Sequence, residues 1–487
     1  MMLSHYFALD SHTGGGLQEQ LRKAMLDAIH AGVIPPEEAL PSCRKLSTQL
    51  GVSRNTVALV YERLVDDGYL VSRPRSGYYL HDAYRADGSE GAASMMLPQP
   101  VMDAPNWNKR LTSRPSYLQN VLRPSQWMTF DYPFIYGQLD QRLFPMEAWR
   151  GASRRVMGAQ RERCWLHDRY DQDDPMLIEQ LRSRVLPKRG IHAQKDEILI
   201  TMGAQNALFL IAQLLLNRQT RVAVENPGYR EAINVLLHQG AEISYQPVDH
   251  EGICLDDNSA RCDYLYVTPS HQVPTGVTMS AERRQQLMQQ VNRYDQIILE
   301  DDYDAEINFD YQAQPALKST AIGSRVIYMS SLSKPLSPGL RLGYLVADAE
   351  LIDELRALRR LMYRHPPSGL QQQLAQFLAQ GHYDRYLRTF NAEMRARWEV
   401  LEETVCREMP HCQRISEAYA SAFWLALPEQ YDSQRLAWQA AQQGVLIEPG
   451  FQHFFSQVPP RHYMRLGYGV IGVEAIPEGI KRLASVL

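Results

Sequence analysis

The stretch RVIYMSSLSKPLSPGLRLGY, residues 325–344, is the part of this 487-residue chain that decides its fold class. It opens with an apolar run, continues through serines to a single lysine, Lys334, and reaches Arg341 just before a second apolar run. A lysine placed directly behind an apolar strand is unusual, because connecting loops are built mainly from small turn residues. We therefore expect this loop to carry chemistry.

Short apolar runs of the same kind recur along the chain, with helical segments between them. They are EILI (197–200), RVAV (221–224), YLYV (264–267), QIILE (296–300), RVIYM (325–329) and GYLVA (343–347). This alternation predicts an α/β fold with a mostly parallel sheet and helices on both of its faces. In open sheets of this type, ligands bind beyond the carboxyl ends of the strands. The loops after these runs are therefore the expected location of a site.

Three of those loops carry the groups that pyridoxal phosphate needs. This cofactor requires a lysine that forms a Schiff base, an acid beside its pyridine nitrogen, and a cup for its phosphate. Lys334 offers the amine, and Asp301 on the neighbouring strand offers the acid, since a buried carboxylate favours the cationic form of its partner. The expected phosphate ligands are Ser331, Ser333, Arg341 and the backbone N–H groups of Gly203, Ala204 and Gln205 at a helix start.

The N-terminal part of the chain has a different pattern. LQEQLRKAMLDAIHAG (17–32) has helical spacing, and two further helical segments flank the turn Gly51-Val52-Ser53. Two alternating segments on either side of residues 74–77 then indicate a hairpin. A helix, a helix-turn-helix and a hairpin in this order predict a winged helix-turn-helix.

Several motifs together resemble the MocR/GabR family of GntR-type regulators. SLSKPLSPGLRLGY (331–344) is similar to the lysine segment of fold-type I aminotransferases, and EDDYDAE (300–306) and TPSHQVPTGVTMS (268–280) occur in the order typical of the family. LPSCRKL (40–46) and GVSRNTV (51–57) resemble the GntR pattern, with Cys43 where glutamate is usual. The resemblance implies a fold-type I, pyridoxal-phosphate-dependent aminotransferase-like domain fused to a winged helix-turn-helix.

The same resemblance implies a division of the chain and a set of partners. We expect a DNA-binding domain over residues 1–82, a linker rich in Gly, Ala, Ser and Pro over 83–128, and an aminotransferase-like effector domain over 129–487. The implied partners are a double-stranded DNA operator, a small amine or amino-acid effector, and a second copy of the chain in a homodimer.

Further roles follow from the resemblance alone. Tyr303 would reach the phenolic oxygen of the cofactor, Tyr229 would flank its ring, and Arg465 would receive the carboxylate of the effector. Tyr170 would reach the phosphate bound by the partner subunit. Alternatively, the three tyrosines are core aromatics and Arg465 is a surface salt-bridge residue.

Two features depart from the pattern of the related enzymes. Val273 stands where an asparagine normally donates a hydrogen bond to the phenolic oxygen of the cofactor, which favours ligand capture over fast turnover. The segment after Tyr170 also lacks the glycine that is usual there.

The DNA contacts expected from the winged helix-turn-helix lie on its two segments. Arg44, Arg54 and Asn55 would contact bases or phosphates, and Ser53 and Thr56 would bind phosphates. The wing, with Arg73, Arg75 and Gly77, would enter the minor groove or its margin. The whole chain has a net charge of -4, so the cationic face is local. Modest affinity of one module would then require two modules in one dimer.

Composition limits the class of protein. The chain has 45% hydrophobic and 22% charged residues, which excludes a mainly disordered chain. Its six cysteines include no CxxC pair, so we expect reduced thiols and no metal site. No apolar run reaches the ~18 residues of a membrane span, and the first ten residues do not resemble a signal peptide. We expect a cytoplasmic protein that does not enter a membrane.

Three hypotheses for function follow. The one that we favour is a transcriptional regulator in which an amine or amino-acid effector reacts or binds at Lys334 and modulates operator binding. The second is an active aminotransferase with a DNA-binding appendage, and the third is a regulator that senses pyridoxal phosphate itself. The sequence does not identify the effector, the operator or the regulated genes, nor does it distinguish an activator from a repressor or show whether transamination is completed.

Overall fold

The chain forms two compact units. The computed structural model describes residues 16–30, 34, 38–74, 76–84, 106–121, 124, 126–158, 166–304, 306–307, 314–415 and 420–487. Unit 1 comprises residues 1–111 and unit 2 comprises residues 112–487. Residues 85–105 of the expected linker lie outside the described part. Within the described residues, no helix has both the length and the apolar character required to cross a bilayer.

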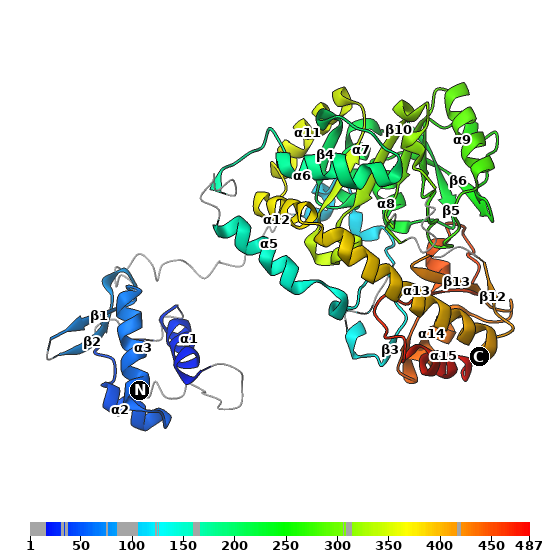
Figure 1. Cartoon of the computed structure of the whole chain (residues 1–487). Coiled ribbons are helices and arrows are strands. Elements are labelled where there is room, and N and C mark those ends of the chain that lie inside the picture. Colours follow the sequence, from blue (N-terminus) through cyan, green and yellow to red (C-terminus); the bar gives the residue numbers. More distant parts are fainter. Residues whose placement is uncertain are drawn as a thin grey trace. The chain divides into compact units, whose positions relative to one another are not determined.

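Unit 1 is a small helical module with a hairpin (Figure 1). Its main elements are α1 (Leu17–His30), α2 (Cys43–Leu50), α3 (Arg54–Asp66), β1 (Leu70–Arg73) and β2 (Gly77–Leu80), and the short α4 (Trp107–Arg110) follows. β1 and β2 pair antiparallel. Val57, Val60 and Leu64 of α3 are buried in a core that they share with α1 and α2. This arrangement confirms the predicted winged helix-turn-helix.

An eight-stranded sheet forms the centre of unit 2. In spatial order its strands are β4 (Ile198–Thr201), β11 (Gly343–Val346), β10 (Val326–Ser331), β9 (Ile297–Asp301), β8 (Tyr264–Val267), β5 (Arg221–Asn226), β6 (Glu242–Asp249) and β7 (Gly252–Ile253). The strands from β10 to β6 are parallel, whereas β11 runs antiparallel to both of its neighbours and β7 antiparallel to β6. The mostly parallel sheet is thus confirmed, and β6 and β7 are strands that the sequence patterns did not indicate.

Helices cover both faces of this sheet (Figure 1). Leu199 of β4 packs in one hydrophobic cluster, and its neighbours Ile198 and Ile200 pack in another, as expected where successive side chains point to opposite faces. The helices of unit 2 are α5 (Met146–Gly158), α6 (Pro175–Gln180), α7 (Ala204–Leu215), α8 (Arg230–His238), α9 (Ala281–Arg293), α10 (Ser333–Leu336), α11 (Ala349–Tyr363), α12 (Ser368–Ala379), α13 (His382–Glu408), α14 (Ser433–Gln442) and α15 (Ile476–Ala484).

A smaller sheet follows α13 in the chain. It contains β12 (Gln413–Arg414), β13 (Ala422–Ala426), β16 (Tyr463–Gly467) and β15 (Glu448–Pro449) in that order, and β3 (Tyr132–Pro133) pairs separately with β14 (Val445–Leu446). The pairing of β3 with β14 brings the start of unit 2 against its C-terminal part. Phe134, directly after β3, also accepts a hydrogen bond from the N–H of Gly467, so this segment lies beside β16.

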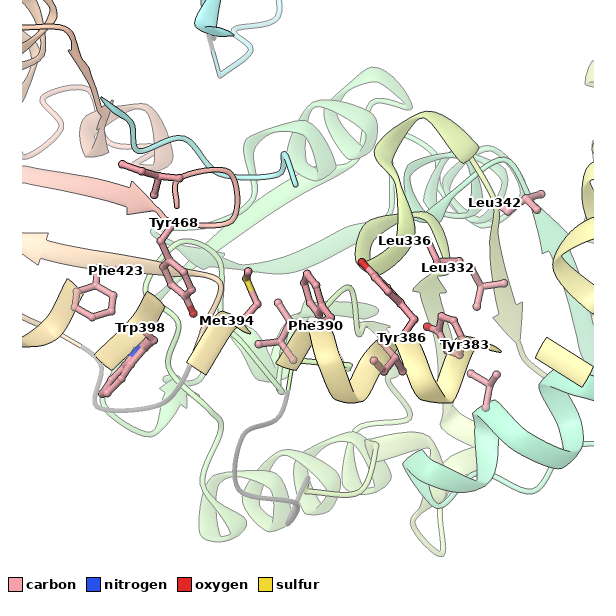
Figure 2. Packing of buried hydrophobic residues seen from close by; sticks show 14 of the residues in the cluster. Leu332, Leu336, Leu342, Tyr383, Tyr386, Phe390, Met394, Trp398, Phe423 and Tyr468 are labelled. Carbon is pink, nitrogen blue, oxygen red and sulfur yellow. The ribbon is translucent and has the colours of Figure 1, made fainter. Parts of the chain in front are cut away.

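The long helix α13 holds in place the lysine loop, which is the segment of residues 332–342 between β10 and β11. Figure 2 shows Tyr386, Phe390 and Met394 along this helix, in the same cluster as Leu332 and Leu336 from the loop. The hydroxyl of Tyr386 also donates a hydrogen bond of 2.5 Å to the carbonyl oxygen of residue 335. The backbone on both sides of Lys334 is thereby fixed by packing and by a buried hydrogen bond.

Candidate functional site

A cavity of about 340 Å³ opens beside the lysine loop. Eight of the residues predicted from the sequence line it, namely Ala204, Gln205, Tyr229, Asp301, Tyr303, Ser331, Lys334 and Arg341. They come from the loops that follow β4, β5, β9 and β10 and from the ends of the last two strands. The structure therefore brings most of the predicted cofactor residues together in one place.

Lys334 extends from the short helix α10 into this cavity. Its Nζ lies 3.8 Å from the ring centroid of Tyr303 and 4.1 Å from that of Tyr136. The carboxylate of Asp304 is 3.5 Å from the same nitrogen. Burial raises the pKa of Asp304 to about 7, although a hydrogen bond from Ser421 and the charge of Arg465 oppose this. A primary amine is thus held among aromatic faces next to one buried acid.

Asp301, at the end of β9, presents an unpaired oxygen. The hydroxyl of Tyr266 on β8 donates a hydrogen bond of 2.7 Å to Oδ2 of Asp301, whereas Oδ1 is buried and has no hydrogen-bond partner. Burial raises the pKa of this carboxyl group to about 7. A buried acceptor without a donor is costly, so this atom is suited to a ligand that brings a polar N–H group.

The neighbouring Asp302 serves the core instead. Its side chain accepts hydrogen bonds of 2.8 Å from Arg189 and from Tyr328. Burial alone would raise its pKa, but the charge of Arg189 and the hydrogen bonds that the carboxylate accepts together outweigh burial and lower the pKa. Successive residues of a strand point to opposite faces, which explains why only one of two adjacent aspartates lines the cavity.

The start of α7 and Arg341 form the expected phosphate end of the cavity. Gly203 caps this helix with a φ of 88°, and a Cβ atom there would lie 3.2 Å from Nη2 of Arg341. A Cβ atom on Gly343, at the start of β11, would lie 2.8 Å from the backbone of Gly203, so β11 and the α7 loop approach each other closely only because residue 343 is glycine. Backbone N–H groups at a helix start together with an arginine form a typical anion site.

The loops after β5 and β8 close another side of the cavity with Tyr229 and Val273. Gln272 is buried and donates hydrogen bonds to Glu225 and to the carbonyl oxygen of Pro227, so it orders these loops. Val273 cannot donate a hydrogen bond into the cavity. The departure seen in the sequence therefore lies in the cavity wall.

Arg465 on β16 is buried, with 4% of its side chain exposed. It makes no side-chain hydrogen bond within the described residues, and its Nε is buried without a partner. Its Nη1 lies 3.6 Å from Glu448, and its guanidinium carbon lies 3.5 Å from the ring centroid of Tyr136. Of the alternative that Arg465 is a surface salt-bridge residue, the surface position is therefore wrong, whereas the ion pair is present, with Glu448.

Among the predicted site residues of unit 2 that the structure describes, Gly203, Tyr170 and Arg465 are not part of the cavity lining. The ring of Tyr170 lies 3.8 Å from the guanidinium carbon of Arg360. The expected role of Tyr170, which is to reach the phosphate bound by the partner subunit, stays a prediction. The side chain of Ser333 lies outside the described part of the structure.

Sequence reasoning missed other residues of the site. Tyr136, Gly137 and Gln138 line the cavity, although they follow a two-residue strand and have no periodic pattern. Tyr266 and Asp304 were also missed. Tyr266 lies within an apolar run and resembles a core residue, whereas the run of acids at 300–304 was a signal that more than one acid faces the site.

The winged helix of unit 1 exposes most of the predicted DNA contacts. Arg44, Arg54, Asn55 and Arg73 are exposed, and Gly77 has a φ of 116° in the hairpin. Ser53 caps α3 by accepting a hydrogen bond of 3.0 Å from the backbone of Thr56. Its oxygen therefore already has one structural role. Arg75 lies outside the described residues.

Comparisons with known proteins agree with this architecture. Residues 137–452 match the family described as Aminotransferase class I and II, and residues 17–80 match the family described as Bacterial regulatory proteins, gntR family. Alpha-aminoadipate aminotransferase LysN of Thermus thermophilus is similar in structure, with a TM-score of 0.70 and 26% identity over 79% of this chain and 98% of that one. The fold and the cavity define an aminotransferase-like protein fused to a GntR-type DNA-binding domain, a fold class that implies dependence on pyridoxal phosphate.

Relatives that match over nearly the whole chain define the family. The HTH-type transcriptional regulator TauR of Rhodobacter capsulatus is 41% identical, with 97% of each chain covered. The probable rhizopine catabolism regulatory protein MocR of Rhizobium meliloti is 30% identical, with 98% of this chain and 95% of the relative covered. The chain belongs to the MocR/GabR family of GntR-type transcriptional regulators, and it is a regulator that binds DNA.

Proposed function

We propose that this regulator binds pyridoxal phosphate in the cavity beside Lys334 and that an amine or amino-acid effector acts there to modulate operator binding. The observation that carries the proposal is the presence, in one cavity, of the Lys334 amine and the unpaired, buried Oδ1 of Asp301. These two groups match the reactive carbon and the ring nitrogen of one cofactor molecule.

The residues present fit the cofactor at three points. Asp301 offers an acceptor to the protonated ring nitrogen, and the positive charge of that nitrogen would favour the ionised form of a carboxyl group whose pKa burial has raised. Arg341 and the N–H groups at the start of α7 would hold the phosphate. Tyr229 and Tyr303 provide aromatic surface on the cavity wall.

Bound pyridoxal phosphate supplies an aldehyde carbon for which the lysine amine and the amine of an effector compete. The protein would hold the Lys334 amine near this carbon and would offer the amine a hydrogen-bond acceptor once it is released. Asp304, 3.5 Å from Nζ, is positioned to accept a hydrogen bond from that amine. Arg465, whose Nε is buried without a hydrogen-bond partner among the described residues, would bind the carboxylate of the effector.

Operator binding follows from the exposed basic face of unit 1. A homodimer would place two winged helices on two half-sites, and two weak modules would together bind tightly. An effector changes this binding only if its affinity differs between two arrangements of the protein. The difference in effector affinity between these two arrangements therefore determines how strongly the effector changes DNA binding.

Val273 favours regulation over turnover. In the aminotransferases that the chain resembles, an asparagine at this place tunes the cofactor, and valine cannot replace its hydrogen bond. Steady-state transfer of an amino group to a 2-oxo acid would support the enzyme hypothesis instead. A change of operator affinity with pyridoxal phosphate alone would support a sensor of the cofactor.

The test is a pair of titrations on one preparation. Purified protein with pyridoxal phosphate is titrated with a panel of amines and amino acids, and its absorbance and its affinity for operator DNA are followed in parallel. The proposal predicts that the same compounds change both. Compounds that change the absorbance but never the DNA affinity would contradict it.

A further inference from the structure

The ring of Tyr136 contacts two cationic side chains of unit 2. Its centroid lies 4.1 Å from Nζ of Lys334 and 3.5 Å from the guanidinium carbon of Arg465. Tyr136 lines the cavity, and 7% of the residue is exposed. One aromatic ring therefore connects the expected amine end of an effector with its expected anion end.

The face of the Arg465 guanidinium stacks on the ring of Tyr136, whereas its N–H groups make only a long contact with an acid. Its Nε is buried without a hydrogen-bond partner among the described residues, and its Nη1 forms an ion pair of 3.6 Å with Glu448, which is longer than a hydrogen bond. Glu448 is itself 2.9 Å from Nε2 of His453, which places the acid beside the arginine. An arginine binds a carboxylate through two coplanar N–H groups, so the plane of its guanidinium decides whether it can bind.

The backbone before Tyr136 is fixed against the strand that carries Arg465. The N–H of Gly467, two residues after Arg465, donates a hydrogen bond of 3.1 Å to the carbonyl oxygen of Phe134. A Cβ atom on residue 467 would lie 2.3 Å from the carbonyl oxygen of Ile135. This contact is possible only with glycine, and it sets the place of the Tyr136 ring over the guanidinium.

We propose that Tyr136 is a positioning residue that fixes the guanidinium plane of Arg465 and thereby selects amine effectors that carry a carboxylate. The inference rests on the proposed function of the cavity. Because both cations touch one ring, the amine and the anion sites are close, and the selected effectors are short amino acids in which few bonds separate the two groups.

The test compares ligand pairs that differ only in the carboxylate. Glycine, β-alanine and 4-aminobutanoate are titrated against methylamine, ethylamine and propylamine on protein with pyridoxal phosphate, and the affinity ratio within each pair is taken from the absorbance change. Tyr136→Leu is expected to lower the preference for the amino acid by about 3- to 30-fold, the size of a desolvated cation–π contact. Tyr136→Phe keeps the ring and is expected to retain the preference.

Arg465→Leu provides the reference for this effect. It should abolish the preference, and adding Tyr136→Leu to it should then change nothing further, because the tyrosine acts through the arginine. An unchanged ratio in Tyr136→Leu would overturn the proposal. An equal loss for amino acids and alkylamines would also overturn it, since it would show a general structural role.

A second readout does not use the cofactor. Calorimetric titration of cofactor-free protein with propionate should show weaker binding to Tyr136→Leu than to the wild type or Tyr136→Phe, and equal affinities would overturn the proposal. If no amine alters the absorbance, the proposed function fails, whereas the propionate titration still reports on Tyr136.

Discussion

Tyr266 donates a hydrogen bond to one carboxylate oxygen of Asp301 and leaves the other oxygen buried without a partner. The two residues lie on neighbouring parallel strands, with Leu299 of β9 paired to Tyr266 of β8. The hydroxyl of Tyr266 thereby orients the carboxyl group and provides a donor to one of its two oxygens. The other oxygen, Oδ1, is therefore suited to a ligand with a polar ring nitrogen.

Substitution of Asp301 by asparagine should have opposite effects on cofactor affinity and on stability. The pKa of Asp301 is raised to about 7, above its ordinary value, so between about pH 4 and pH 7 the carboxyl group is protonated in the folded chain and ionised in the unfolded chain. Its contribution to stability therefore falls as the pH rises from about 4 to about 7 and is constant above that. Asp301→Asn should stabilise the cofactor-free protein at pH 8, by about 1–3 kcal/mol, and by less at pH 5.

Thermal melts at the two pH values measure this effect, and a titration with pyridoxal phosphate should show weaker binding to the same variant. Asp257→Asn, a change to an exposed carboxylate, is the control and should alter neither property. Tighter cofactor binding by Asp301→Asn would refute the assignment of this acid.

Gly343→Ala should disrupt the close contact between the start of β11 and the α7 loop. The added methyl group would lie 2.8 Å from the backbone of Gly203 and from the carbonyl oxygen of Ser330, and backbone cannot move as a flexible side chain can. We expect a loss of about 1–3 kcal/mol in unfolding free energy together with weaker binding of pyridoxal phosphate. Gly151→Ala is the matched control, because a Cβ atom there meets nothing within 4 Å and helix α5 favours alanine. Equal denaturation midpoints for the two variants would show that the close approach is not required.

Arg54→Ala should weaken operator binding by about 1–3 kcal/mol if its side chain reads a base. Arg54 is exposed at the first position of α3, the second helix of the helix-turn-helix. Gel-shift or fluorescence titrations with operator DNA measure the effect. Lys23→Ala removes one exposed positive charge from α1 and serves as the charge control. If the two variants bind the operator equally well, Arg54 does not have this role.

Periodicity and loop chemistry predicted the sheet and one end of the site. The apolar runs at 197–200, 264–267 and 325–329 correspond to β4, β8 and β10, and Lys334 and Asp301 share a cavity as expected. These predictions succeed because strand order and the parallel direction bring the carboxyl ends of strands to one edge. At this edge of the sheet, the local sequence pattern is therefore enough to predict which residues come together.

The rest of the site depends on contacts that leave no local pattern. Tyr136 reaches the cavity because β3 pairs with β14 from the far end of the chain, and nothing in residues 132–138 reveals that pairing. Tyr266 resembles a core tyrosine until its partner Asp301 is placed on the next strand. The burial of Arg465 likewise depends on Tyr136 and Glu448, which are distant in sequence.

The most direct test of the central claim is an absorbance titration with pyridoxal phosphate of the wild type, of Lys334→Ala and of Lys195→Ala, an exposed lysine that serves as the control. The wild type and Lys195→Ala should show a protein-bound visible band. Lys334→Ala should lose this band, and its operator binding should no longer respond to amines. A wild-type protein that stays colourless with the cofactor, or a Lys334→Ala variant that keeps the band, would contradict this claim.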